Sequence, residues 1–175
     1  MIVFLGMAGS GKSTQCRRLS TELGLHWISI GEVLRQSEHG KSRDAMLHGL
    51  VLDDTIVMPI VEKELKRSGD TPEILLDGCP RTVAQARWLA ESKDPSVRVV
   101  IHLVLDDEIA LRRLLQRQRE DDTEQSIRQR FAGYHRDIEA VLAEFQRVGC
   151  PIRAVRADAT KDEVYEAIVR SVTKP

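Results

Sequence analysis

The chain has 175 residues, of which 42% are hydrophobic and 30% charged. This composition is typical of one globular domain that can bury a full core. The formal net charge of −1 provides no overall field that would attract nucleic acid or an acidic membrane.

The N-terminal apolar run at residues 2–5 is shorter than a signal peptide, and no stretch of the sequence is long enough to span a membrane. The three cysteines, Cys16, Cys79 and Cys150, lie far apart and form neither a disulfide framework nor a paired metal motif. We therefore expect free thiols in a cytoplasmic protein, with no nucleic-acid or membrane partner.

Short apolar runs alternate with helical patterns along the chain. Strands are predicted at residues 2–5, 27–30, 73–77, 97–105 and 151–155. Helices are predicted over residues 12–23, along an apolar stripe ending near Gly149, and after the capping box formed by Thr160 and Glu163. Because the strands are apolar on both faces and separated by helices, we expect an α/β fold with a five-stranded parallel sheet flanked by helices.

One segment departs from this alternation. Residues 31–72 contain no long apolar run and read as a helical arm inserted into the α/β domain.

Residues 6–14, GMAGSGKST, match the phosphate-binding pattern G-x-x-x-x-G-K-[ST] between a strand and a helix. Glycines let backbone N–H groups turn toward phosphate oxygens, and the helix N-terminus adds positive potential. The sequence therefore predicts a three-layer P-loop NTPase fold that binds ATP. The residues expected around the ATP phosphates are Gly6, Ala8, Gly9, Ser10, Gly11, Lys12, Ser13 and Thr14.

A magnesium site is expected next to this loop. The Ser13 hydroxyl can ligate Mg²⁺, and Asp77 ends a predicted buried strand, where an acid would hold the ion through water. Asp106 and Asp107 also follow a predicted strand, but their position favours helix capping.

Several arginines stand beside predicted loops. A planar guanidinium binds phosphate through two hydrogen bonds and keeps its charge, which suits a site that brings two anionic nucleotides together. The candidates are Arg35, Arg81, Arg113, Arg117, Arg119 and Arg130.

Four stretches together resemble adenylate kinases, in that family's order and over most of the chain. They are GMAGSGKSTQ at residues 6–15, WISIGEVLR at 27–35, LLDGCPRT at 75–82 with Gln85, and REDDTEQSIRQR at 119–130 followed by Tyr134 and His135. The resemblance implies a monomeric nucleoside monophosphate kinase that reversibly transfers the γ-phosphoryl group of ATP, with Mg²⁺, to an acceptor. Gln85 in this family accompanies adenine, so AMP is the expected acceptor.

The resemblance also assigns residues to the acceptor side. Arg35 and Arg81 would hold the α-phosphate of the acceptor, and Gln85 would hydrogen-bond its base. The full set implied for the acceptor is Ile30, Arg35, Leu52, Gly78, Arg81, Gln85, Arg119 and Arg130.

On the donor side the resemblance implies that Arg113 lies against the ATP adenine, with the backbone at Lys161 as a second contact. The catalytic set it implies is Lys12, Arg81, Arg117, Arg119 and Arg130. Asp121 and Asp122 match acids that anchor the lid hinge by ion pairs with these arginines. The implied division is a core at residues 1–30, 68–116 and 131–175, an acceptor-binding arm at about 31–67, and a short lid at about 117–130.

Three positions depart from the family pattern. Ser13 replaces a glycine, with little expected effect. Ile30 stands where adenylate kinases carry threonine and UMP/CMP kinases alanine, and its side chain cannot hydrogen-bond to a base; Thr82 and Gln85 still favour AMP. Only Gln118 separates Arg117 from Arg119, which leaves no room for a zinc-binding or β-stranded lid, and we expect more ATP hydrolysis than in a long-lid relative.

Three other functions compete with this reading. One is a UMP/CMP-type kinase with the same mechanism, and another is a P-loop kinase of a small metabolite such as shikimate or gluconate. The third is an adenylate-kinase-like ATPase that works as a switch or assembly factor. The acceptor-side arginines and Gln85 favour a nucleoside monophosphate kinase over the last two.

Overall fold

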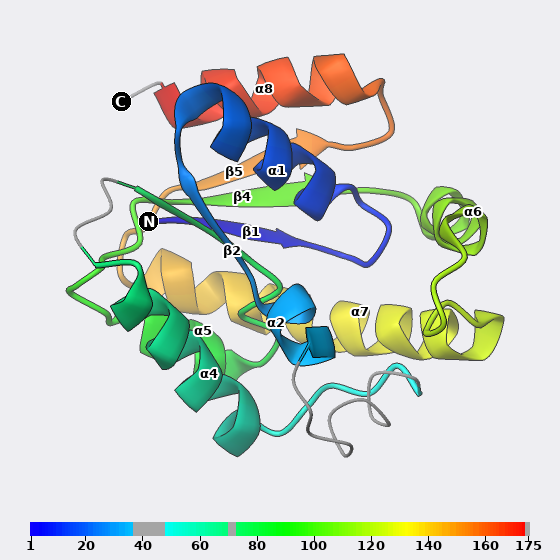
Figure 1. Ribbon diagram of the computed structural model, residues 1–175, viewed down its shortest axis with the longest axis horizontal. Helices are drawn as coiled ribbons and strands as arrows, with labels where there is room; N and C mark the ends of the chain where they lie inside the picture. The colour runs from blue at the N-terminus through cyan, green and yellow to red at the C-terminus, as the bar shows by residue number, and fades with distance from the viewer. Residues whose placement is uncertain (37–47, 70–72, 174–175) are drawn as a thin grey trace.

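A computed structural model describes residues 1–36, 48–69 and 73–173 of the chain. Its centre is a parallel sheet in the order β2-β3-β1-β4-β5, which confirms the predicted five-stranded parallel sheet (Figure 1). The strands are β1 (Ile2–Gly6), β2 (His26–Ser29), β3 (Ile74–Asp77), β4 (Val99–Val104) and β5 (Ile152–Arg156).

Helices cover both faces of the sheet and make the predicted three layers (Figure 1). On one face α1 (Lys12–Leu23) and α8 (Lys161–Thr173) pack against the sheet, and they share a buried apolar cluster with β1 and β4. On the other face lie α5 (Val83–Ala90) and α7 (Glu124–Arg147), over a second apolar cluster. Burial on both faces explains why these strands read as continuous apolar runs.

In its described residues, 31–36 and 48–69, the segment predicted as an inserted arm contains parts of two helices. They are α2 (Ile30–Gln36) and α4 (Asp54–Arg67), and α4 packs beside α5. Asp53 caps α4, because its carboxylate accepts from Thr55 N at 2.8 Å. Residues 37–47, which the predicted arm includes, lie outside the described residues.

Helix α6 (Asp107–Arg117) lies beyond the carboxyl ends of the strands (Figure 1). Its cap confirms the role predicted for Asp106, whose carboxylate accepts from Glu108 N at 2.8 Å. The predicted capping box before α8 is also present, since the Glu163 carboxylate accepts from Thr160 N at 2.9 Å. Within residues 1–36, 48–69 and 73–173, no helix is long and apolar enough to cross a membrane.

Two predicted strands are too long. The strand predicted at 27–30 stops at Ser29, because Ile30 begins α2, and Ser29 Oγ accepts from Glu32 N at 3.4 Å across that turn. The strand predicted at 97–105 pairs only over β4, while Val97 and Leu105 pack against the core beside it. Apolar residues that are buried beside the sheet, but not hydrogen-bonded within it, therefore have the same sequence pattern as a strand.

Candidate active site

The loop between β1 and α1 is shaped to surround an anion. Gly6, Gly9 and Gly11 all have positive φ, and a Cβ atom on Gly9 would lie 2.8 Å from Ala110 O. The N-cap residue of α1 is Gly11, which has no side chain, so it provides no side-chain acceptor for the first N–H groups of the helix. A helix N-terminus of this kind favours phosphate.

Lys12 projects into the same loop. Its Nζ donates to Gly6 O at 2.7 Å and to Met7 O at 2.9 Å. Burial lowers the pKa of Lys12, and the nearby Asp77 carboxylate opposes part of that shift. The ammonium group is therefore held among backbone carbonyls, where a bound phosphate would add a further anionic partner.

Ser13 and Asp77, the two residues predicted to hold Mg²⁺, meet at the carboxyl end of β3. Ser13 Oγ donates to Asp77 Oδ2 at 2.6 Å, and Asp77, at the end of β3, is buried. A hydroxyl and a carboxylate are hard oxygen donors of the kind that Mg²⁺ prefers, and this pair fits the ion directly or through water. Among the residues described here, no cluster of three or more His, Cys, Asp or Glu could hold a metal by protein ligands alone.

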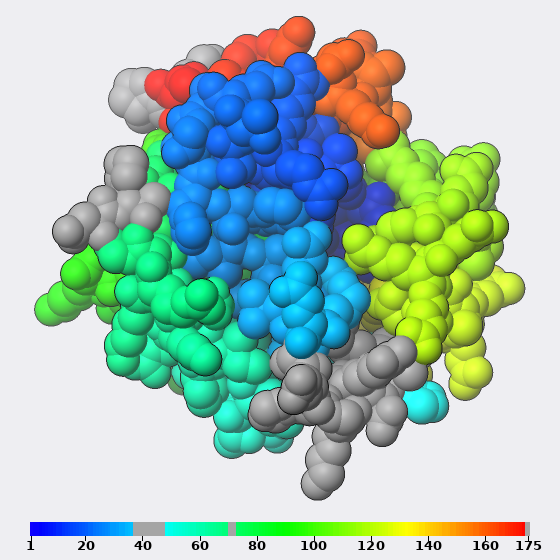
Figure 2. Space-filling model, viewed as in Figure 1, coloured from blue at the N-terminus to red at the C-terminus, as the bar shows by residue number. Residues whose placement is uncertain are grey.

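A cleft of about 580 Å³ opens in front of this loop, within the size range of small-molecule sites. In the space-filling view the first residues, in the deepest blue, are set back between the lighter blue of α1 and α2 and the yellow-green of α6 (Figure 2). The cleft brings together most of the predicted nucleotide-binding residues, including Asp77, Gly78, Arg113, Lys161 and the whole phosphate loop.

Besides Arg113, five predicted arginines line this cleft from separate elements: Arg35, Arg81, Arg117, Arg119 and Arg130. Surrounding protein lowers the pKa of Arg35, Arg81 and Arg119, even though the cleft leaves Arg35 and Arg81 accessible to solvent. Neighbouring guanidinium groups add to each shift; for Arg119 they are those of Arg117 and Arg35. Like charges held this close stabilise a multiply charged anion placed among them.

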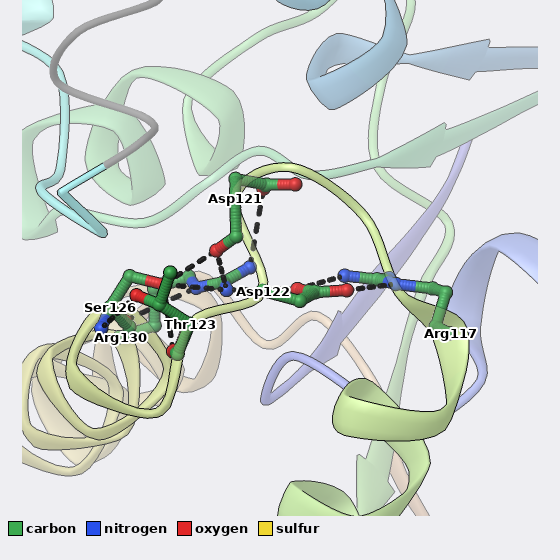
Figure 3. A network of polar contacts seen from close by, with 6 residues as sticks. All are labelled: Arg117, Asp121, Asp122, Thr123, Ser126 and Arg130. Carbon is green, nitrogen blue, oxygen red and sulfur yellow. Dashed lines mark hydrogen bonds and ion pairs between the residues drawn. The ribbon is translucent and has the colours of Figure 1, made fainter.

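A short link, residues 118–123, joins α6 to α7 and is braced by ion pairs (Figure 3). The Asp122 side chain is 0% exposed and lies between two guanidinium groups. Arg117 donates to both of its carboxylate oxygens at 2.8 Å, and Arg130 donates to Oδ1 at 3.0 Å. Burial acts to raise the pKa of Asp122, but these hydrogen bonds outweigh it and hold the pKa below its usual value.

Asp121 completes the brace from the other side of Arg130. Arg130 donates to Asp121 O at 2.6 Å and contacts its carboxylate at 3.4 Å. The ion pairs expected from Asp121 and Asp122 are therefore present in the structure. Helix α7 begins at Glu124, so much of the segment expected to be lid is already the first turns of a helix.

The three predicted acceptor residues outside the main cleft line a small recess beside it. Ile30, Leu52 and Gln85 surround about 20 Å³ of space, together with Leu34, Val57 and the edge of the cleft at Gly78 and Arg81. The lining side chains are apolar except those of Gln85 and Arg81, so these two have to supply any polar side-chain contact to a molecule in the recess.

Sequence reasoning missed two groups near the site. Asp54 binds Gln85 Nε2 at 2.7 Å, and Tyr134, which lines the cleft, hydrogen-bonds His102 Nε2 at 2.7 Å. The sequence shows that Asp54 could lie on the first turn of a helix, but it does not show that Gln85 of another helix is its partner. Tyr134 and His102 read equally well as core residues, because each lies on an apolar stripe.

The fold, the phosphate loop and the arginines that line the cleft define a class of protein, a P-loop phosphotransferase. Sequence comparison then shows the family, because a family model described as adenylate kinase matches residues 4–150. The chain belongs to the adenylate kinase family and is a phosphotransferase enzyme.

Three relatives illustrate the similarity, and all three are named adenylate kinase. The protein of Synechococcus sp. (strain CC9902) is 37% identical over 97% of this chain and 96% of its own length. That of Pseudarthrobacter chlorophenolicus is 33% identical over 98% and 95%. That of Thermus thermophilus is 33% identical over 95% and 94%.

Proposed function

We propose that this cleft carries out the reaction of its family, the reversible transfer of the γ-phosphoryl group of ATP to AMP to give two molecules of ADP. One observation carries the proposal: arginines from the arm, the core and the lid link converge on a single cleft in front of the phosphate loop. A site for one nucleotide triphosphate does not require cationic side chains on the side remote from the loop, whereas a site for two phosphate groups does.

The donor nucleotide would occupy the phosphate loop. The N–H groups at the start of α1 and the Lys12 ammonium would hold the β- and γ-phosphates. Arg113 and the backbone at Lys161 would bound the adenine side of the cleft, where Arg113 donates to Ala157 O at 2.9 Å. Ser13 and Asp77 would hold Mg²⁺, whose charge offsets that of the phosphates.

The acceptor would lie between the arm and the core. Arg35 and Arg81 would bind the α-phosphate of AMP, and the recess around Ile30, Leu52 and Gln85 would take the base. The recess has room for roughly one water molecule, so we expect the arm to move outward to admit a purine.

Transfer requires positive charge around the moving phosphoryl group and two nucleotides held in line. Lys12, Arg117, Arg119 and Arg130 line the cleft and would supply that charge. The ion pairs of Asp122 with Arg117 and Arg130 fix the direction of two of these guanidinium groups before substrates arrive. No covalent intermediate on the protein is needed.

The test is an acceptor panel with purified protein. ATP–Mg²⁺ is incubated with AMP, dAMP, CMP, UMP or GMP, and ADP and the acceptor diphosphate are quantified against a control without acceptor. We expect rapid conversion with AMP. Preference for CMP or UMP would replace the acceptor and keep the mechanism. Loss of ATP with no diphosphate product from any acceptor would reject the transfer reaction in favour of an ATPase switch.

The competing functions have less support. The relatives that match almost the whole chain are named adenylate kinase, which does not favour the pyrimidine kinase or the assembly ATPase. We further expect the enzyme to work as a cytoplasmic monomer, with nucleotides as its partners. Size-exclusion chromatography with light scattering checks the oligomeric state.

A further inference from the structure

The amide group of Gln85 is held at both ends. Its Oε1 accepts from Arg81 N at 2.8 Å and from Cys79 Sγ at 3.5 Å. Its Nε2 donates to Asp54 Oδ1 at 2.7 Å. The residue is 1% exposed and lines the recess assigned to the acceptor base.

These partners fix which end of the amide is which. The backbone N–H of Arg81 can only donate, so it must face the amide oxygen. The Asp54 carboxylate can accept but not donate when ionised, so it must face the amide nitrogen. Turning the amide over would place two donors together and two acceptors together. The orientation therefore follows from chemistry and does not depend on telling oxygen from nitrogen.

The hydrogen-bonding capacity that remains is also fixed. Both lone pairs of Gln85 Oε1 are used by Arg81 and Cys79, and one of the two N–H groups is used by Asp54. The second N–H group has no partner in the described part of the chain. Gln85 can thus offer the recess a donor, and it has no acceptor left to offer.

Asp54 is itself anchored between the arm and the core. It is the first residue of α4, and its Oδ1 and Oδ2 accept from Thr82 Oγ1 at 2.9 and 3.1 Å. Thr82 in turn caps α5, where its hydroxyl oxygen accepts from Gln85 N at 3.2 Å. The Asp54 carboxylate therefore binds both the N-cap residue of α5, Thr82, and the side chain of Gln85 in the same helix.

We propose that Asp54 is a positioning residue for acceptor choice, which acts by locking Gln85 so that its free N–H points to the ring nitrogen of the base. This rests on the proposed function, with AMP in the recess. Adenine differs from hypoxanthine only at position 1 and the neighbouring position 6. Position 1 of adenine is an acceptor and suits the free N–H, whereas position 1 of hypoxanthine carries a proton and opposes it.

The same rule sorts the other acceptors. Guanine and uracil carry a ring N–H on this edge and are disfavoured by the locked donor. Cytosine carries an acceptor there, so Asp54 and Gln85 do not exclude it, and only the shape of the recess can. Ile30 needs no hydrogen bond in this scheme, because the base is selected by the Gln85 donor, and the other lining side chains apart from Arg81 are apolar.

Acceptor analogues test the proposal on the unmodified enzyme. We would measure kcat and KM for AMP, IMP and 1-deaza-AMP, in which carbon replaces the ring nitrogen at position 1, at saturating ATP–Mg²⁺. Leaving a buried donor unpaired should lower kcat/KM for both analogues by roughly ten- to hundredfold relative to AMP, mainly through KM. Equal kcat/KM for AMP and 1-deaza-AMP would overturn the inference.

Variants then separate Asp54 from Gln85. In Asp54→Ala the amide is released, and we expect KM for AMP to rise about tenfold, kcat to change less than about twofold, and the preference for AMP over IMP to shrink. The matched control is Asp53→Asn, which removes the neighbouring carboxylate at an exposed cap and should leave both kinetic constants and the preference unchanged. An Asp54→Ala enzyme that behaves like this control contradicts the role of Asp54.

Exchanging the carboxylate of residue 54 and the amide of residue 85 gives the most direct test of acceptor choice. In the double variant Asp54→Asn with Gln85→Glu, the net charge is kept, but residue 85 now offers an acceptor to the base. Preference should move from AMP toward IMP, and an unchanged preference in a folded double variant would count against the proposal. Failure of the proposed function looks different, because the unmodified enzyme would then form no ADP from AMP.

Discussion

The Lys12 ammonium is surrounded by its own loop, with Nζ donating to Gly6 O and Met7 O. Burial lowers its pKa, which means that the folded protein disfavours this charge in the absence of an anion. A residue kept charged at a cost to stability is expected to serve binding or catalysis, and Lys12 faces the cleft where both phosphate groups would meet.

Replacing Lys12 with methionine should therefore separate activity from stability. We expect kcat for ADP formation to fall by at least about 100-fold, because a charge aimed at the transferring phosphoryl group is lost. The Tm should change little, because the apolar stem is kept and removal of the disfavoured charge offsets the loss of the hydrogen bonds to Gly6 O and Met7 O. Coupled kinetics and a thermal melt measure the two effects. A lower Tm with unchanged kcat would contradict this account.

His102 on β4 gives a prediction about pH. Burial lowers its pKa below the ordinary value of 6.5, and Lys12 adds to that shift, while the ring accepts or donates one hydrogen bond with Tyr134. The unfolded chain therefore binds a proton at His102 at a higher pH than the folded protein does. By linkage, the free energy of unfolding decreases as the pH falls below about 6.5.

Urea unfolding between pH 5 and pH 7.5 checks this effect. The variant His102→Gln, which can still hydrogen-bond Tyr134 but does not titrate, should show a weaker decrease in stability over that range. Parallel curves for the two proteins would show that another group is responsible.

At the scale of elements, the link between α6 and α7 is held by its acids. Asp122 is 0% exposed at its side chain and binds both Arg117 and Arg130, which are themselves only partly exposed. Its removal leaves two guanidinium groups without their shared partner. Charges inside a protein that lose their partner are costly, far more so than those of exposed ion pairs.

We predict that Asp122→Asn lowers the free energy of unfolding by about 2–3 kcal/mol. It should also lower kcat, because the guanidinium groups of Arg117 and Arg130 lose their direction. The control is Glu124→Gln, which breaks the exposed pair of Glu124 with Arg128 on the same helix and should change stability by less than about 0.5 kcal/mol. Denaturant unfolding and steady-state kinetics on both variants decide the point.

The extent to which the sequence determines these elements differs from place to place. The glycine pattern and the apolar runs predicted β1, α1 and the sheet, since local periodicity and turn chemistry carry that information. The apolar, β-branched side chain of Ile30 favours a strand in the sequence, whereas in the structure Ile30 is the buried first residue of α2. The contact of Asp54 with Gln85 joins residues 31 positions apart, which no local pattern encodes.

At the scale of the whole molecule, the short link bears on how well the cleft excludes water. Closure of a lid normally keeps water away from the phosphoryl group. Here six residues, 118–123, connect α6 to α7, and no strand lies between those helices in residues 73–173. We expect a link of that size to leave part of the cleft, which measures about 580 Å³, open to water.

We therefore expect measurable hydrolysis of ATP when no acceptor is present, at a larger fraction of kcat than in a relative with a long lid. Phosphate release from ATP–Mg²⁺ measures it, with a relative carrying a long lid assayed in parallel and Lys12→Met as the blank. Absence of detectable phosphate above the blank would show that the cleft excludes water by other means.

The brace in this link is built from residues that are close in the chain. Arg117 lies 5 positions from Asp122, and Arg130 lies 8 and 9 positions from Asp122 and Asp121. Closing so short a loop costs little chain entropy, so ordering the link lowers the stability of the fold only slightly. The link between α6 and α7 then needs no large movement of its own when nucleotides enter or leave the cleft. ADP should leave soon after it forms, and the viscosity of the surrounding solvent should have little influence on the speed of turnover.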